Sequence, residues 1–143
     1  MLLPMNGYSS TESEIQSLIG SFPIDVSISV EEVGDLKKSQ IMNDVELKLL
    51  QSNIKITDNS DYLLGIFVYS TKQPQIDAIL YSVHIEFDQL VKLLDSRRVI
   101  NTTTWSKSYY GITPLSKSYN VRDAVKDLLD EFLLDYLKAN PVK

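Results

Sequence analysis

Residues 121–137, VRDAVKDLLDEFLLDYL, decide the fold class of this 143-residue chain. Their apolar side chains recur at steps of three and four residues, which is the period of a helix that buries one face. Asn120 is a good N-cap residue with Asp123 at the third helical position, and Asn140-Pro141 provides a stop. The sequence therefore predicts a long helix of about 18 residues that begins after Asn120 and ends near Asn140. Its buried stripe is Val121, Val125, Leu128, Leu129, Phe132, Tyr136 and Leu137.

Five further segments carry strand patterns. In residues 24–31 and 76–91, apolar and polar side chains alternate, as in a strand with one buried face. Residues 62–70 are a nearly continuous apolar run, which is typical of a central strand buried on both faces. The predicted strands are residues 24–31, 54–56, 62–70, 76–91 and 99–110.

Two more segments carry helix patterns. Thr11 followed by Glu14 is a capping-box pattern, which predicts a short helix over 11–19 that ends at Gly20. From residue 39 the period becomes helical again, and this second helix ends near Ser52-Asn53. Its apolar stripe is Ile41, Val45 and Leu49.

The order of these elements is (α)βαββββα, with one β-α-β crossover followed by hairpins. The sequence predicts the α+β class: a two-layer domain with a mixed, mostly antiparallel sheet of four to five strands and both long helices on one face. We expect residues 1–20 to form an N-terminal arm with the short helix, and residues 21–143 to form a single domain. The other sheet face is more polar and stays free for a partner or a second copy of the chain.

The composition excludes several functional classes. The chain has 19 acidic and 14 basic residues and a formal net charge of −5, which opposes binding to nucleic-acid phosphates and anionic lipid headgroups. Lys37-Lys38 and Arg97-Arg98 are isolated basic pairs that do not offset this charge. There is no cysteine, which excludes disulfides, thiolate zinc sites and cysteine nucleophiles. We therefore expect no nucleic-acid partner.

The compartment stays open. No segment approaches the roughly 20 apolar residues that span a bilayer, so we expect no transmembrane segment. Residues 1–5, MLLPM, are too short for the core of a signal peptide and lack its basic leader. Either the protein stays in the cytoplasm, or Met1 stands where a signal peptide has been removed and the protein lies in the bacterial periplasm or envelope.

Two polar clusters have the residue types of a chemical site. His84 is the only histidine, and Glu86 and Asp88 share its strand face. Such side chains are about 7 Å apart per step, too far to reach one metal ion together. The acids of the last helix alternate with basic residues, as on an exposed helix face with i,i+4 pairs; they are Asp123, Asp127, Asp130 and Glu131, with Arg122, Lys126 and Lys138. We predict no catalytic residue, no metal site and no cofactor.

Residues 102–110 have the most distinctive composition. Strict alternation puts Thr103, Trp105 and Tyr109 on one face, and Tyr110 with Thr102, Thr104 and Ser106 on the other. Hydroxyl and aromatic side chains suit the binding of a peptide or a small ligand, and they also suit a strand that closes the core beneath a helix. The second interpretation is favoured. The candidate binding residues are Thr103, Trp105, Tyr109 and Tyr110.

Residues 44–54 (DVELKLLQSNI), 103–105 (TTW) and 127–141 (DLLDEFLLDYLKANP) resemble a family of small bacterial proteins of unassigned function. The resemblance covers roughly residues 24–141, and its motifs are helix-face and core patterns, so no catalytic residue carries over. The order of elements also resembles α/β domains of bacterial envelope proteins: the TolB amino-terminal domain, the CsgG periplasmic domain and LpoB-like lipoproteins. The resemblance implies a binding and assembly module rather than an enzyme.

The sequence thus favours a non-catalytic interaction or assembly domain that binds a protein partner or itself through its sheet edge or free sheet face. Enzymatic activity stays undecided, although no Gly-rich phosphate loop and no Gly-x-Ser-x-Gly motif is present. The alternative is a small-molecule-binding protein or a minor enzyme, with a pocket lined by Trp105, Tyr109, Tyr81 and His84. That alternative requires Trp105 and His84 to lie on the same face of the sheet.

Overall fold

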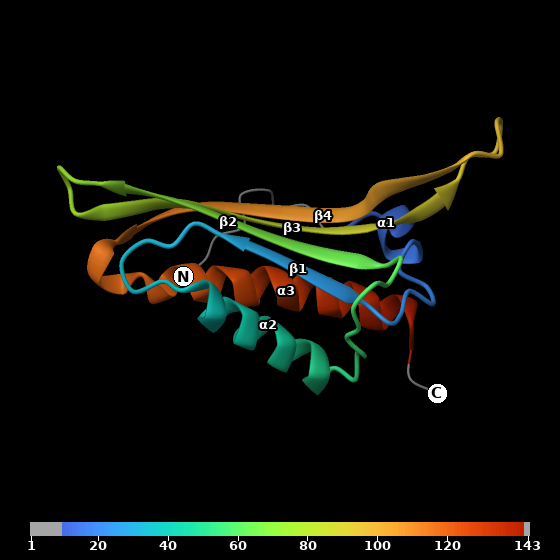
Figure 1. Cartoon of the computed structure of the whole chain (residues 1–143), viewed down its shortest axis with the longest axis horizontal. Helices are drawn as coiled ribbons and strands as arrows, with labels where there is room; N and C mark the ends of the chain where they lie inside the picture. Colours follow the sequence, from blue (N-terminus) through green and yellow to red (C-terminus); the bar gives the residue numbers. More distant parts are fainter. Residues whose placement is uncertain (1–9, 142–143) are drawn as a thin grey trace.

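A computed structural model describes residues 10–141 and shows two layers (Figure 1). A four-stranded sheet forms one layer, and the two long helices form the other beneath one of its faces. The predicted α+β class and the placement of both helices on one face are confirmed. The elements are α1 (Glu12–Gln16), β1 (Asp25–Val30), α2 (Lys38–Gln51), β2 (Leu63–Gln73), β3 (Ala78–Lys92), β4 (Val99–Pro114), the 3-10 turn η1 (Leu115–Lys117) and α3 (Tyr119–Ala139).

The strand order in the sheet is β1-β2-β3-β4, which leaves β1 and β4 at the two edges. β1 and β2 are parallel and are joined through α2, whereas β2, β3 and β4 are successive antiparallel hairpins. The prediction of a strand at 54–56 is wrong, because only an isolated bridge joins Ile56 to Ile24. Asn53, with φ of 60°, turns the chain just before this segment, and the loop over 57–62 follows directly after Ile56.

The core lies between the sheet and the helices, and Phe132 of α3 is at its centre. Its ring centroid lies 5.1 Å from that of Trp105 and 5.5 Å from that of Phe87. The predicted stripe of α3 is buried except for Leu137, which is exposed one position further round the helix, whereas Leu133 is buried. Ile41, Val45 and Leu49 of α2 are fully buried, as expected.

The start of α3 differs from the prediction. The turn η1 leads directly into the helix, so that Ser118 is the N-cap residue and the helix begins at Tyr119. Asn120 is therefore already helical, and its Nδ2 donates to Thr113 Oγ1 at 2.8 Å. The predicted end is correct, because Asn140 follows the last helical residue and its Nδ2 donates to Tyr136 O at 3.1 Å.

The two long helices are joined by ion pairs between them. Arg122 of α3 donates from Nε and Nη2 to the two oxygens of Asp44 at 2.9 and 3.0 Å. Lys48 Nζ of α2 lies 2.6 Å from Asp130 Oδ1. The expectation that these charges pair along α3 is therefore wrong for Arg122 and Asp130, because α2 lies close enough to supply their partners.

The alternation in β3 is confirmed, with Ile79, Tyr81, Val83, Ile85 and Phe87 facing the helices. The expectation that residues 62–70 are buried on both faces is wrong. Tyr69 is exposed and Phe67 is only partly buried, because no helix covers that side of the sheet.

A β-bulge changes the predicted faces of β4. Phe87 pairs with Trp105, but the next residue, Asp88, pairs with Thr103, so Thr104 is an extra residue in β4. Beyond the bulge the alternation is shifted by one position. Thr103 therefore lies on the uncovered face, and the expectation that it shares a face with Trp105 is wrong.

The N-terminal segment packs against the domain. Thr11 and Glu14 form the predicted capping box at the start of α1. The helix ends at Gln16, and a turn continues to Gly20, whose φ is 69°. Leu18 in this turn is fully buried in the core. Residues 1–9 of the expected arm lie outside the described residues.

None of the helices in residues 10–141 is both long and apolar enough to cross a membrane.

Candidate functional site

The four candidate residues of β4 do not form one site. Trp105 and Tyr109 face the helices, whereas Thr103 and Tyr110 lie on the uncovered face. Thr103 pairs with Asp88 and Tyr110 pairs with Ser82, so that about 20 Å of strand separates them. Thr103 Oγ1 donates to Asp88 Oδ1 at 2.5 Å.

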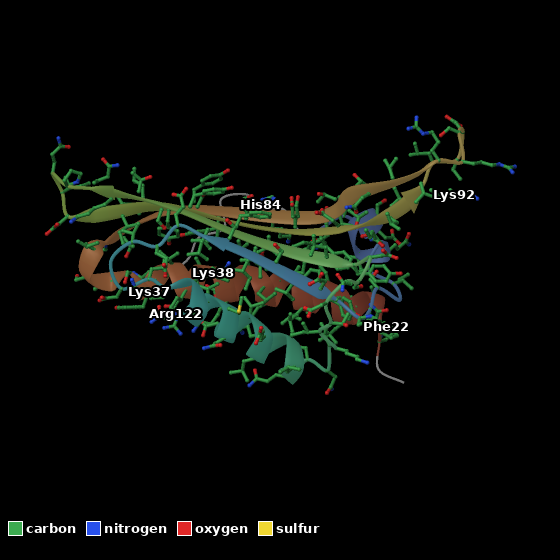
Figure 2. All side chains as sticks on the ribbon, in the orientation of Figure 1. Phe22, Lys37, Lys38, His84, Lys92 and Arg122 are labelled. Carbon is green, nitrogen blue, oxygen red and sulfur yellow. The ribbon has the colours of Figure 1, made fainter. Side chains whose placement is uncertain are left out.

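Trp105 joins β4 to the helix layer. It is 1% exposed, and its Nε1 donates to Asp135 Oδ2 at 3.0 Å. Asp135 is itself buried and also accepts a hydrogen bond from Ser10 Oγ. His84 lies on the opposite face of the sheet (Figure 2). The prediction of one pocket lined by both Trp105 and His84 is therefore wrong.

An apolar surface covers part of the helix-free face. Tyr69, Leu80, Tyr110 and Ile112 are each between 44% and 59% exposed, and the partly buried Phe67 adjoins them. Leu80 pairs with Ile112, and Ser82 pairs with both Tyr69 and Tyr110, so the set is contiguous across β2, β3 and β4. We call these five residues the face patch. Exposed apolar patches of this kind mark interaction surfaces.

A shallow hollow of about 430 Å³ lies within the face patch. Phe67, Tyr69 and Tyr110 line it together with a polar row centred on His84. His84 Nδ1 lies 2.6 Å from Ser108 Oγ, and His84 Nε2 lies 3.1 Å from Glu86 Oε2. The ring of Phe67 adjoins the imidazole, with 6.1 Å between centroids.

The row of Ser108, His84 and Glu86 has the residue types of a nucleophilic triad. If Nε2 donates to the Glu86 carboxylate, Nδ1 is free to accept the Ser108 hydroxyl proton. Acyl transfer also needs donors aimed at the oxyanion. Ser108 lies in the middle of a strand, where backbone N–H groups lie in the plane of the sheet and do not point at a group above it. The row therefore fits a hydrogen-bonded polar rim better than a catalytic site.

A larger cavity of about 600 Å³ lies between β4 and α3, and we call it the acidic cavity. Tyr81 and Tyr109 form its wall, with ring centroids 6.0 Å apart. Burial, together with Tyr109, raises the pKa of Tyr81 to about 12. The two rings fit because Gly111 lies opposite Tyr81, where a Cβ would come within 2.6 Å of the Tyr81 ring.

Three acidic side chains of α3 line this cavity: Asp123, Asp127 and Asp130. Lys48 pairs with Asp130 at 2.6 Å, and Lys126 lies 3.7 Å from Asp123. Asp127 has no ion pair within residues 10–141. Burial, followed by the neighbouring Asp130 and Asp123, raises the pKa of the Asp127 carboxyl above its ordinary value. A cation brought by a ligand would relieve this repulsion.

Neither cavity holds the donor set of a metal site. Within the part of the chain that the structure describes, no three acidic or histidine side chains gather closely enough to hold a metal ion. Glu86 and Asp88 both share the face of His84, yet only Glu86 contacts the imidazole.

The fold and its surfaces define a small α+β domain with one uncovered sheet face. No protein-family model matches the chain, and no curated protein matches it. Bacterial proteins are among the solved structures that resemble it. A PelC dodecamer from Paraburkholderia phytofirmans is 14% identical over 98% of both chains, with a TM-score of 0.47.

Two further structures show similar likenesses. A Xanthomonas campestris protein of family DUF330 is 14% identical, covers 97% of this chain and 98% of its own, and has a TM-score of 0.46. A minor lipoprotein from Acinetobacter baumannii is 13% identical, covers 78% of this chain and 89% of its own, and has a TM-score of 0.39. At these scores we base no functional inference on the likenesses.

Proposed function

We propose that this protein is a non-catalytic assembly domain that binds a second copy of itself through the uncovered face of its sheet. The observation that supports the proposal is the face patch, in which four large apolar side chains are each between 44% and 59% exposed. Its aromatic members, Phe67, Tyr69 and Tyr110, are of the type enriched in protein interfaces.

The shape of the patch suits contact with a second sheet. Sheets that pack face to face lie about 10 Å apart, with side chains of both faces interdigitated. The exposed rings of Tyr69 and Tyr110 border the hollow of about 430 Å³. In a two-fold dimer the same patch occurs on both copies, so that rings of one copy are placed to fill the hollow of the other.

Light scattering coupled to size-exclusion chromatography over a concentration series tests this proposal. We expect the wild-type chain to form a dimer or larger species as concentration rises. The variant Tyr69→Thr/Tyr110→Thr removes both exposed rings and keeps residues that favour strands, and it should weaken association about tenfold or more. A wild-type chain that stays monomeric throughout the series would refute the proposal.

A matched control uses exposed apolar residues of the helix layer. Leu47 of α2 and Leu134 of α3 are exposed to a similar extent as the patch residues but lie on the other side of the molecule. The variant Leu47→Gln/Leu134→Gln should associate like the wild type. If this control weakens association as much as the face-patch variant does, association depends on general surface hydrophobicity and not on the face patch.

A second candidate function, small-molecule binding, is favoured by the acidic cavity. Its volume of about 600 Å³ lies within the usual range of ligand sites, and the candidate residue Tyr109 lines it. A thermal-shift screen with cationic small molecules tests this candidate. Binders whose effect disappears in Asp127→Asn would support it, and no shift with any cation would count against it.

We further propose that the assembly works in the bacterial envelope. The support is the resemblance in order of elements to envelope domains such as the TolB amino-terminal domain and the CsgG periplasmic domain. Fractionation of cells that express the chain from its native gene, followed by immunoblotting, tests the location. Recovery in the cytosolic fraction alone would contradict it.

A further inference from the structure

The hairpin that joins β3 and β4 extends beyond the helix layer as an arm (Figure 1). We call residues 90–100 the hairpin arm, and Lys92 marks it in Figure 2. Leu94 at its tip is 94% exposed. Apolar side chains that are exposed together in this way mark an interaction surface. The exposed apolar residues of the arm are Leu90, Leu93, Leu94, Val99 and Ile100.

The hairpin arm is basic although the whole chain is acidic. It carries Lys92, Arg97 and Arg98 against the single acid Asp95, while the chain has a net charge of −5. None of these three cations forms an ion pair with another group in residues 10–141. The arm therefore offers apolar surface and unpaired positive charge at the same place.

The acidic cavity offers the complementary chemistry at the other end of the molecule. It is lined by the C-terminal part of β4 and the first half of α3, whereas the arm projects from the end where α3 finishes (Figure 1). Tyr81 and Tyr109 provide apolar surface inside it. Asp127 provides a carboxylate that forms no ion pair within residues 10–141, because the neighbouring Lys48 and Lys126 pair with Asp130 and Asp123.

We propose that the hairpin arm of one copy docks into the acidic cavity of a second copy, with Leu94 against the tyrosine wall and Arg97 or Arg98 beside Asp127. This inference rests on the proposed function in that both describe self-assembly, but it names different surfaces. The contact joins two unlike surfaces. Two copies can therefore exchange arms, each arm entering the cavity of the other, or successive copies can be linked head to tail. Together with a face-to-face contact it would produce species larger than a dimer.

A second copy fits the arm better than an anionic membrane does. The rest of the chain is more acidic than its net charge of −5 shows, because the arm itself is basic, and an anionic surface would repel it. The acidic cavity offers both a negative charge and the concave tyrosine wall of Tyr81 and Tyr109, whereas a headgroup layer offers no such shape.

Sedimentation velocity on the full chain tests the contact by charge reversal. The arm variant is Arg97→Glu/Arg98→Glu, and the cavity variant is Asp123→Lys/Asp127→Lys; all four side chains are exposed, so folding should be retained and is checked by circular dichroism. Each variant alone should associate at least about tenfold more weakly through this contact. An equimolar mixture of the two should regain association, because intact arms then meet intact cavities. The control Lys37→Glu/Lys38→Glu reverses a basic pair outside the arm and should not weaken association.

The same measurements in the Tyr69→Thr/Tyr110→Thr background separate this inference from the proposed function. If the wild type forms only dimers and the face-patch variant is monomeric, the arm contact is refuted and the face contact stands. If the face-patch variant associates like the wild type while the arm variant is monomeric, the reverse holds. An arm variant that self-associates normally but no longer sediments with phosphatidylglycerol vesicles would overturn the inference in favour of a membrane.

Discussion

Replacement of Trp105 tests whether this residue belongs to the core or to a binding site. In Trp105→Phe, the carboxylate of the buried Asp135 loses the indole N–H at 3.0 Å and keeps only the Ser10 hydroxyl. A hydrogen bond to a charged group contributes about 1.5–3 kcal/mol. The volume left by the smaller ring adds about 1 kcal/mol. We therefore expect the free energy of unfolding to fall by about 3 kcal/mol, a large share of the stability of a small domain.

The assay is urea unfolding followed by far-ultraviolet circular dichroism, because Trp105 is the only tryptophan and its fluorescence is lost in the variant. Tyr110→Phe is the control: this exposed residue of the same strand should change stability by less than about 0.5 kcal/mol. Asp135→Asn keeps an acceptor for the indole N–H, so it should cost less than Trp105→Phe.

The double variant Trp105→Phe/Asp135→Asn completes a thermodynamic cycle. Because the two side chains are in contact, their effects should not add, and the difference from additivity should exceed about 0.5 kcal/mol. If Trp105→Phe lowers stability by less than about 1 kcal/mol, or the two effects simply add, the assignment of Trp105 as the link between β4 and α3 is refuted.

Three further predictions concern the acidic cavity. Gly111→Ala should lower stability by about 1–3 kcal/mol in urea unfolding, because the new Cβ lies 2.6 Å from the Tyr81 ring; no change would show that the ring moves freely. The pKa of Tyr81 is raised to about 12, so the unfolded state ionises first and stability should fall as pH rises from about 10 to 12. In an ultraviolet titration of the tyrosines, Tyr81→Phe should lack the tyrosine that ionises at the highest pH in the wild type. Loss of a tyrosine that ionises at lower pH would contradict the assignment of the raised pKa to Tyr81. Burial and neighbouring acids raise the pKa of Asp127, so its ionised form disfavours folding, and the native state is favoured at pH values below the unfolded pKa. Asp127→Asn should therefore raise the thermal midpoint at neutral pH while weakening arm-dependent association, and a lowered midpoint would contradict this.

Local repetition is what made the helices predictable. Every turn of α2 returns an apolar side chain to the same face, and Ile41, Val45 and Leu49 are all fully buried. The capping box of α1 was predictable for the same reason, since Thr11 and Glu14 contact each other within one turn.

The β-bulge was not predictable, because it depends on contacts between distant parts of the chain. Thr104 has the same strand preference as its neighbours, and nothing local distinguishes it. Its Oγ1 accepts from Gln89 Nε2 at 2.7 Å, and the same amide nitrogen donates to Ser17 O at 2.7 Å. The bulge therefore forms where β3, β4 and the segment after α1 meet.

Ion pairs between the helices were missed for a similar reason. Arg122 and Asp44 are 78 positions apart, and only the packing of α3 beside α2 brings them together. A pattern within α3 alone also permits i,i+4 pairs, which is what the sequence suggested.

The face patch, in contrast, can be derived from the sequence once it is clear that the domain has only two layers, one of sheet and one of helices. Two long helices cover one face of the sheet, so outward side chains of every strand must face either solvent or another molecule. Extending the period-2 pattern of β4 past Tyr110 places Ile112 on the same face, beside the outward Leu80 of β3. The patch shares this face with polar side chains such as His84 and Glu86. Its aromatic residues Phe67 and Tyr69 were not expected to be accessible, because residues 62–70 were predicted to be buried on both faces. Within residues 10–141, the single tryptophan lies in the core, and the most exposed tyrosines lie on the uncovered sheet face and at the start of α3. No element in residues 10–141 covers this side of the sheet, so its apolar side chains are accessible to the second copy that we propose.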